Sequence, residues 1–396
     1  MTAPSSASLL SSVPMAPKDP ILGEKRPTAP PQVTFSERAT IELGGTLVEL
    51  FEAQAHRTPD APAVTCDGRT LTYAELNALA DVVATRLVTE HSAGAEAIVG
   101  LRMARSIEMV AGILGTLKAG AGYLPLDPTY PPERLAFMVE DSQAVVTLTS
   151  DDIGGAPGAR RRRAVLPAQT AYVIYTSGST GMPKAVINTQ RMLCSNLQQI
   201  GQCFPCLGDK PPVFVDWLPW NHVFGGNHNF GLVLYNGGTL YIDDGRPVPG
   251  LVEKTVQNLR EISPTIYFSV PRGYDALLPF LREDKALRDS FFRRLELLQY
   301  AAAVLPQPTW KAYEDLAAQA CGERVQWITG YGATETAPET APPDAAASEA
   351  AATASATLAG TGSGNGKGES LMIRTCAFSS RGGSVPGRGN PTTETF

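Results

Sequence analysis

Apolar residues at helical spacing mark the first predicted elements of the chain. Leu47, Leu50 and Phe51 predict a helix, which the prolines that follow bring to an end. A longer helix is predicted after the turn at Asp67-Gly68, with an apolar face made of Leu76, Leu79, Ala80, Val83 and Leu87. Ser106 can cap a third helix that extends to Leu117.

Short apolar runs then alternate with helical patterns over the rest of the patterned chain. The runs begin at Val145, Ala171, Val213, Thr239, Thr265 and Val325. The helical patterns between them cover residues 190–200, 250–261, 273–281 and 308–320. Apolar strands separated by helices are typical of a largely parallel sheet covered on both faces, so the predicted fold class is α/β.

Both ends of the chain have a different composition. Residues 1–39 are rich in Pro, Ser, Ala and Thr, and residues 339–396 are mostly small and polar. Such segments cannot bury enough apolar surface to offset the entropy of ordering them. We therefore expect a disordered leader at 1–39, a folded core at 40–338 and a disordered tail at 339–396.

Composition excludes several classes of function. The 33 Lys and Arg residues against 39 Asp and Glu give a net charge of −6, so a basic nucleic-acid-binding surface is not expected. No apolar run approaches the ~18 residues of a membrane span, and the start lacks the pattern of a secretory signal. Six scattered cysteines do not form a disulfide framework. A cytoplasmic protein without nucleic-acid or membrane partners is expected.

The segment from Tyr175 to Lys184 carries the clearest chemistry in the sequence. It follows an apolar strand and is expected to enter a helix near Asn188. Gly178 and Gly181 allow the backbone to curl so that successive N–H groups point at an anion. The hydroxyls and the cation that could join them belong to Thr176, Ser177, Ser179, Thr180 and Lys184. These residues favour a polyphosphate site, and the alternative is an ordinary turn rich in Ser and Gly.

This segment resembles the phosphate loop of the adenylate-forming (AMP-binding) superfamily. LTYAEL at Leu71, the stretch from Leu117 and the stretch from Gly330 to Glu335 also resemble motifs of that family. The first third is most similar to adenylation domains of peptide synthetases, and the remainder is most similar to feruloyl-CoA synthases. The resemblance implies the family's large N-terminal domain, with two stacked α/β subdomains.

The resemblance also implies a reaction and the residues that perform it. A carboxylate attacks the α-phosphorus of ATP, pyrophosphate leaves, and the acyl-adenylate then reacts with CoA. Catalytic roles are implied for Lys184, His222, Thr334 and Glu335, with Thr334 bonded to the α-phosphate and Glu335 to Mg²⁺. The implied nucleotide site adds Ala301, Ala302, Tyr331 and Gly332 to residues 176–181. Without the phosphate loop beside it, the Thr334-Glu335 pair could equally cap a helix.

The acid pocket is expected around the stretch from Val215 to Asn229. The implied pocket residues are Trp220, His222, Phe224 and Gly330. Amino-acid-activating relatives tend to carry Asp where this chain has His222, so an acid without an α-amine is favoured. Flat aromatic side chains suit a planar aryl acid, which indicates a hydroxycinnamate such as ferulate.

The resemblance ends near Pro338, before the β-barrel and the small C-terminal domain that relatives contain. Two alternatives to the CoA ligase therefore stay open. One is a truncated core that binds nucleotide without full ligase activity. The other is an amino-acid adenylation domain that loads a carrier protein. The expected partners are an aryl acid, ATP with Mg²⁺, and CoA, and protein partners are left open.

Overall fold

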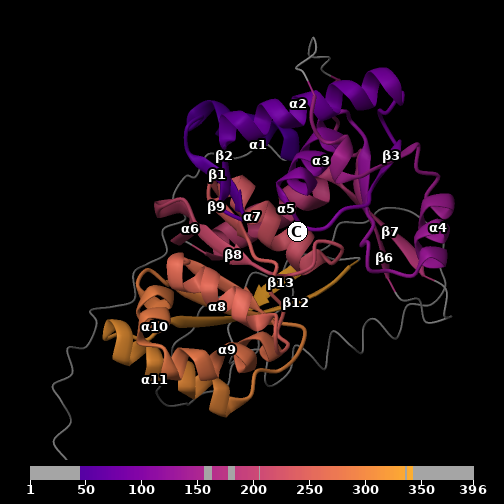
Figure 1. Cartoon of the computed structure of the whole chain (residues 1–396). Helices are drawn as coiled ribbons and strands as arrows, with labels where there is room; N and C mark the ends of the chain where they lie inside the picture. The colour runs from indigo at the N-terminus through magenta and orange to yellow at the C-terminus, as the bar shows by residue number, and fades with distance from the viewer. Residues whose placement is uncertain (1–44, 156–162, 177–182, 205, 335–336, 342–396) are drawn as a thin grey trace, which may run out of the picture.

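Strands and helices alternate along the chain in the computed structural model, and the strands form three sheets (Figure 1). The structure describes residues 45–155, 163–176, 183–204, 206–334 and 337–341. The α/β prediction is confirmed, because most neighbouring strands in each sheet are parallel and are connected through helices. The predicted leader and most of the predicted tail lie outside the described residues.

The five-stranded sheet has the order β5-β3-β4-β6-β7, and only β7 runs antiparallel to its neighbour. Its strands are β3 (Ile98–Leu101), β4 (Gly122–Pro125), β5 (Val146–Leu148), β6 (Thr170–Thr176) and β7 (Lys184–Thr189). The helices of this part are α2 (Tyr73–Glu90), α3 (Ile107–Lys118) and α4 (Pro132–Asp141), and a short 3₁₀ turn covers Ser150–Asp152. This sheet carries the predicted phosphate loop between β6 and β7.

A four-stranded sheet of order β2-β1-β9-β8 joins distant parts of the sequence. Its strands are β1 (Pro62–Cys66), β2 (Arg69–Thr72), β8 (Val213–Asp216) and β9 (Thr239–Ile242). The helices that belong to this region are α1 (Leu47–Arg57), α5 (Gln190–Cys203), α6 (Cys206–Asp209) and α7 (Phe230–Asn236). The π-helix η2 (Phe224–Asn229) leads directly into α7.

The third sheet has the order β10-β11-β12-β13 and lies in the orange part of Figure 1. Its strands are β10 (Ile266–Ser269), β11 (Leu297–Ala301), β12 (Gln326–Ala333) and β13 (Ala337–Ala341). Its helices are α8 (Val252–Glu261), α9 (Pro271–Glu283), α10 (Lys285–Phe292) and α11 (Gln307–Cys321). The Thr265 backbone N–H donates to the Val213 carbonyl at 3.0 Å, so this sheet begins beside β8.

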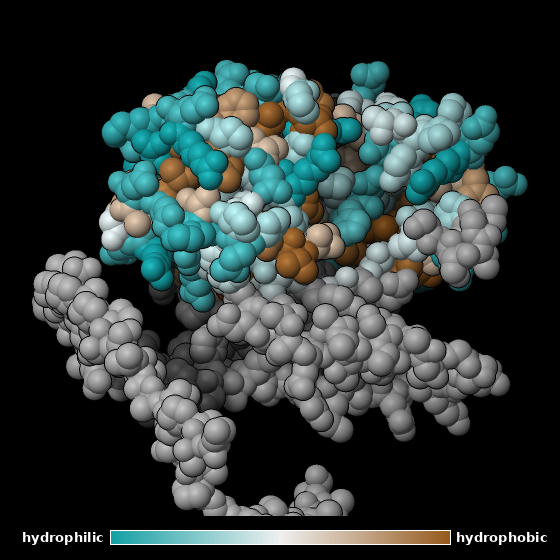
Figure 2. Space-filling model, turned by 90° about the horizontal axis from the view of Figure 1, so that it is seen from below, coloured by the Kyte–Doolittle hydropathy of each residue, from teal (hydrophilic) through white to brown (hydrophobic). Residues whose placement is uncertain are grey.

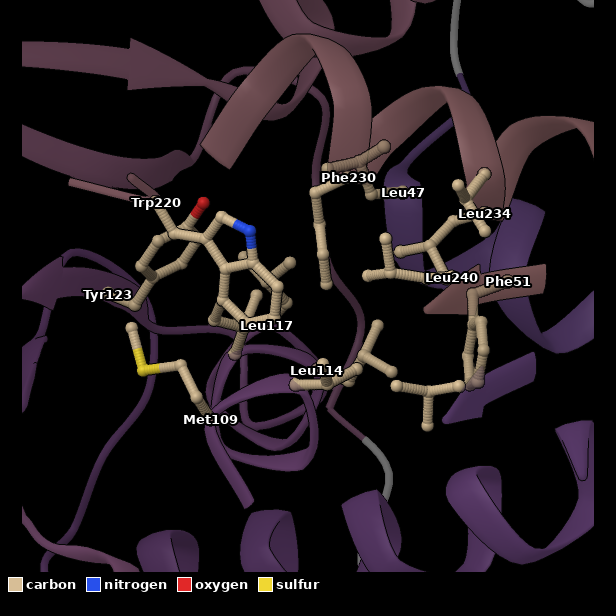
Figure 3. Close-up of a cluster of buried hydrophobic side chains, with 14 of the residues drawn as sticks. Leu47, Phe51, Met109, Leu114, Leu117, Tyr123, Trp220, Phe230, Leu234 and Leu240 are labelled. Carbon is tan, nitrogen blue, oxygen red and sulfur yellow. The ribbon is translucent and has the colours of Figure 1, made fainter. Parts of the chain in front are cut away.

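Two large hydrophobic cores and a smaller one support these sheets in the described residues, and the smaller one lies between α4 and the five-stranded sheet. The largest joins α1, α3, α7 and β9 through Phe51, Leu114, Phe230 and Leu240 (Figure 3). The second is rich in aromatic rings, which meet edge to face around Tyr274 between α9, α11 and β12. Separate cores are consistent with the two α/β subdomains expected from the sequence.

The described surface is largely hydrophilic on the face seen in Figure 2, with hydrophobic residues in small separate groups. Over all described residues, the large apolar side chains that stay exposed are Val145, Leu166, Ile187, Met192, Val248 and Val304. No helix in the described ranges is both long and apolar enough to cross a lipid bilayer.

Several elements differ from the sequence prediction. The helix expected near Asn188 begins at Gln190, because residues 184–189 form β7 and pair with β6. β7 lies at the edge of its sheet and buries only Asn188, so its sequence lacks the apolar run of a central strand. Strand β11 was not predicted as a separate element, and β13 spans the boundary expected at Pro338.

The cap predicted at Ser106 is confirmed and gives a direct test of the fold. Its Oγ accepts the Met109 backbone N–H at 3.2 Å at the start of α3. Ser106→Ala should lower the free energy of unfolding by about 1 kcal/mol in urea titrations, because one N–H loses its partner. Ser106→Asp keeps an acceptor and should stay near wild type. An alanine variant as stable as the wild type would contradict this role.

Candidate functional site

The β6–β7 hairpin brings the two ends of the predicted phosphate loop together. Thr176 and Lys184 are direct partners across the antiparallel pair, with Thr176 half-buried and Lys184 exposed. The loop residues Ser177, Gly178, Ser179, Thr180 and Gly181 lie outside the described residues. The described ends place one hydroxyl and one cation at the mouth of the same loop.

The second nucleotide motif lies beside this hairpin. Asn188 on β7 is fully buried, and its Nδ2 donates to the Thr334 carbonyl at 3.4 Å. Thr334 follows β12 and is half-buried. After it the chain returns as β13, antiparallel to β12, so the alternative of a helix cap at this position is wrong. Two segments about 150 residues apart in the sequence are thus neighbours in the fold.

Neighbouring strands also align the other predicted nucleotide contacts. Ala301 at the end of β11 pairs with Gly330 on β12, and both are half-buried. Ala302 follows with φ of 75°, a left-handed conformation that is uncommon for a residue with a Cβ. Tyr331 and Gly332 continue β12 and pair with β13. Glu335, the predicted Mg²⁺ ligand, lies outside the described residues.

His222 lies in the loop between β8 and η2 and is exposed. Its Nδ1 accepts the Phe224 backbone N–H at 3.2 Å, so the ring proton of the neutral form is on Nε2. Neighbouring protein atoms desolvate the ring and lower the pKa of His222 below its ordinary value. At neutral pH this side chain therefore offers an uncharged N–H donor, which suits a carboxylate or phosphate oxygen.

The two predicted pocket aromatics take different positions. Trp220 is 2% exposed and lies among the core side chains, with Phe230 at a ring distance of 5.5 Å (Figure 3). Its Nε1 donates to Asp216 Oδ2 at 3.4 Å. Phe224 is also buried, but it packs edge to face on His228 and Phe268. The structure thus brings Phe224 next to Phe268 of the third sheet.

Close backbone contacts hold the π-helix η2 against the loop that carries His222. A Cβ on Gly226 would lie 2.3 Å from the Trp220 carbonyl oxygen, and one on Gly225 would lie 2.6 Å from the Pro219 oxygen. Only glycine permits this approach. Single-turn π-helices occur frequently at functional sites, and the last three residues of η2 are all polar and buried.

Five buried polar residues of this region were assigned no role by the sequence analysis, although four of them lie in the stretch expected to form the acid pocket. They are Asp216 at the end of β8, Asn227, His228 and Asn229 in η2, and Gln299 on β11. Burial raises the pKa of Asp216 to about 6 and lowers the pKa of His228 to about 4. The run Asn227-His228-Asn229 was a possible signal, since three consecutive polar side chains precede an apolar helix.

A cavity of about 270 Å³ lies away from these residues, between α1, α2, α3 and residues 163–165. None of the predicted site residues lines it. The buried cation beside it, Lys118, donates to Asn77 Oδ1 at 2.5 Å and pairs with Asp81 at 2.7 Å and Glu52 at 3.3 Å. Its charge is therefore compensated within the protein, and we assign this region to the packing of the helices.

Metal binding cannot be assigned to the described residues alone. Across the described ranges, no three His, Cys, Asp or Glu side chains converge as a metal site. Mg²⁺ prefers oxygen ligands and commonly takes several of them from the phosphates of its nucleotide. A single carboxylate such as Glu335 can supply an oxygen ligand of this kind. Because Glu335 lies outside the described residues, its role in Mg²⁺ binding stays a prediction.

Comparison with known families gives a match over most of the chain. The family described as "AMP-binding enzyme" matches residues 51–166 and 155–361. These ranges contain every residue assigned above to the nucleotide and the acid.

Similar proteins of known name are much longer than this chain. Tyrocidine synthase 3 of Brevibacillus parabrevis is 37% identical over 232 residues, which cover 53% of this chain and 3% of the synthase. Phosphinothricin tripeptide synthetase PhsB of Streptomyces viridochromogenes is 37% identical over 224 residues, or 47% of this chain and 18% of the synthetase. The chain therefore spans a small part of these relatives.

Solved structures agree with the fold. The nonribosomal peptide synthetase FmoA3, in a form with bound AMPPNP, matches with a TM-score of 0.64 and 25% identity over 76% of this chain and 33% of that chain. VinN, solved in complex with L-aspartate, matches with a TM-score of 0.65 over 77% of this chain and 81% of its own. Its 22% identity supports likeness of fold alone.

Proposed function

Because the chain belongs to the AMP-binding enzyme family, we propose that it activates a carboxylic acid as an acyl-adenylate at the expense of ATP. The observation that carries this proposal is the contact between Asn188 and the Thr334 carbonyl. It holds the end of β12 against the hairpin that bears Thr176 and Lys184. In this proposal the Lys184 cation, the hydroxyls of the loop and the Glu335 carboxylate would surround one triphosphate.

The proposed reaction needs positioned charge more than covalent catalysis. A carboxylate oxygen of the acid attacks the α-phosphorus, the bond to the bridging oxygen breaks, and pyrophosphate leaves with that oxygen. Negative charge spreads over the phosphoryl oxygens in the transition state, where fixed donors and cations stabilise it. We assign Lys184 and the loop of residues 176–181 to the phosphates, Thr334 to the α-phosphate and Glu335 to Mg²⁺. Ala301, Ala302, Tyr331 and Gly332 would surround the base.

For the acid and its acceptor, we propose an amino acid and the thiol of a carrier protein. The names of the relatives support this choice, since they include peptide synthetases. CoA, which the sequence favoured as the acceptor, is not supported by those relatives. In this proposal His222 donates from Nε2 to the acid or its adenylate, and Phe224 with Gly330 bounds the pocket.

An aryl acid transferred to CoA is the second candidate, and one observation favours it. An amino acid's ammonium calls for a nearby anion, and His222 stands where amino-acid-activating relatives tend to carry Asp. One carboxylate of this region, Asp216, already accepts three N–H groups and is 1% exposed. It has little capacity left for a substrate.

An ATP–pyrophosphate exchange assay with a panel of acids separates the two candidates. The panel contains the proteinogenic amino acids together with cinnamate, 4-hydroxycinnamate and ferulate. Exchange that is strongest with an amino acid supports the first candidate, and exchange that is strongest with an aryl acid supports the second. The absence of exchange with every acid, from folded protein with Mg²⁺, would contradict the proposed activity.

Lys184 provides a test of the phosphate loop. Lys184→Met should lower kcat/KM for ATP in the exchange assay by at least about tenfold, because a charge-assisted contact with the triphosphate is lost. Much of the loss should appear as a higher KM, since the contact also exists before the transition state. The matched control is Lys285→Met, at an exposed lysine paired with Asp289 on α10. Equal losses in both variants would remove Lys184 from the site.

A further inference from the structure

We infer that four buried side chains, Gln299, His228, Asn229 and Asp216, form a directional hydrogen-bond chain that leaves the Gln299 carbonyl oxygen as an acceptor for the acid. The acids selected would carry an N–H or O–H donor, an inference that rests on the proposed function. In this arrangement Gln299 contacts the acid, whereas the other three are positioning residues.

The direction of the hydrogen-bond chain is set at Asp216. Its Oδ1 accepts the Leu218 backbone N–H at 3.3 Å and the Asn229 Nδ2 at 2.8 Å, and its Oδ2 accepts the Trp220 Nε1. An ionised carboxylate has no proton to give, so every group around it must donate. Asn229 therefore turns its NH₂ group toward Asp216.

The orientation of Asn229 fixes the tautomer of His228. With Nδ2 committed to Asp216, the Oδ1 of Asn229 faces the His228 ring at 2.9 Å from Nδ1. An amide oxygen can only accept, so Nδ1 of the ring must carry the proton. His228 is fully buried between Phe224 and Phe268, an apolar setting that favours the neutral ring. Its Nε2 is therefore a bare acceptor.

The tautomer of His228 in turn fixes the amide of Gln299. Gln299 Nε2 lies 3.5 Å from His228 Nε2, and only the Gln299 NH₂ can donate across this gap. The opposite atom of the amide, Oε1, is fully buried and has no hydrogen-bond partner among the described residues. A buried acceptor without a partner is costly, and a flip of the amide would break the contact with His228.

The Gln299 amide neighbours residues that are proposed for the acid and the nucleotide. Gln299 shares one face of β11 with Ala301, because side chains two residues apart in a strand point the same way. Across the sheet, Ala301 pairs with Gly330, and across the layer His228 packs against Phe224. The Gln299 amide is thus among the residues proposed for the nucleotide and acid sites.

A ligand that donates to Gln299 Oε1 gives this oxygen a hydrogen-bond partner. A ligand of similar shape without a donor leaves the oxygen unpaired. The test compares kcat/KM in the exchange assay within pairs that differ by one donor-bearing group. The pairs are L-tyrosine and L-phenylalanine, L-threonine and L-valine, L-phenylalanine and 3-phenylpropanoate, and 4-hydroxycinnamate and cinnamate. In the pair that the enzyme uses best, we expect the donor-bearing acid to be favoured by roughly tenfold to hundredfold.

Variants separate selection by Gln299 from general damage to the fold. Gln299→Leu should reduce the preference within that pair to less than about threefold. His228→Phe keeps Gln299 but removes its anchor, so the preference should also fall. His228→Gln can accept from Gln299 and donate to Asn229, so it should restore the preference. Loss of overall rate with an unchanged preference in Gln299→Leu would overturn the inference.

Failure of the inference is distinguishable from failure of the proposed function. Robust exchange without a preference in any pair overturns the inference alone. If no acid supports exchange, the same pairs are compared by calorimetric binding, where equal affinities overturn it. In either case, ¹⁵N spectra of labelled protein should show His228 as the neutral ring with the proton on Nδ1. A proton on Nε2 would contradict the proposed hydrogen-bond chain.

Discussion

Glu335→Gln is expected to lower the rate of acid-dependent ATP–pyrophosphate exchange by about 100- to 1,000-fold. Glutamine keeps the size of the side chain but removes the negative charge proposed to hold Mg²⁺. The protein would then lose the carboxylate that would hold Mg²⁺, and the metal's stabilisation of negative charge in the transition state would weaken. The measurement is the exchange rate at saturating acid over a range of Mg²⁺ concentrations.

The Mg²⁺ dependence distinguishes a metal ligand from a structural carboxylate. In Glu335→Gln, half-maximal exchange should require several-fold more Mg²⁺ than in the wild type. The control is Glu323→Gln, which removes an exposed carboxylate just before β12, at the other end of the strand from Thr334. A Glu335 variant with wild-type rate and Mg²⁺ requirement would exclude this residue from the metal site.

Short-range sequence patterns were sufficient to predict the elements that residues close in sequence stabilise. Ser106 as a cap and the apolar face of α2 were predicted because capping and amphipathic spacing involve residues only three or four positions apart. Strand β7 was missed for the opposite reason. It is stabilised by its pairing with β6, and the exposed side chain of Ile187 at the sheet edge gives no periodic signal.

The same distinction applies to the candidate site. The loop from Tyr175 to Lys184 is a contiguous motif, so its residues could be identified from the sequence, and the hairpin brings its ends together. The link between His228 and Gln299 joins positions 71 residues apart, and no local pattern reports such a contact. Trp220 could not be placed either, because an aromatic residue in a loop can face the core as readily as a pocket.

The buried pair of Asp216 and His228 makes opposite contributions to stability as the pH changes. Burial raises the pKa of Asp216 from 3.8 to about 6, so its contribution is largest below pH 3.8 and is lost as the pH rises through 6. Burial lowers the pKa of His228 from 6.5 to about 4, so its contribution is present above pH 6.5 and is lost as the pH falls through 4. Each group changes the free energy of unfolding by about 3 kcal/mol over its pH range. The two changes have opposite signs, so they nearly cancel between pH 4 and 6.

His228→Gln removes the titratable ring and keeps a side chain that can form the same hydrogen bonds. The variant should become more stable relative to the wild type on acidification, by about 3 kcal/mol between pH 7 and pH 4, because its unfolded state no longer gains a proton at position 228. Urea unfolding at a series of pH values measures the difference. Asp216→Asn is the matched control, and its stability relative to the wild type should change in the opposite direction. A pH-independent difference for His228→Gln would mean that His228 is protonated alike in both states, and the neutral, buried ring would be wrong.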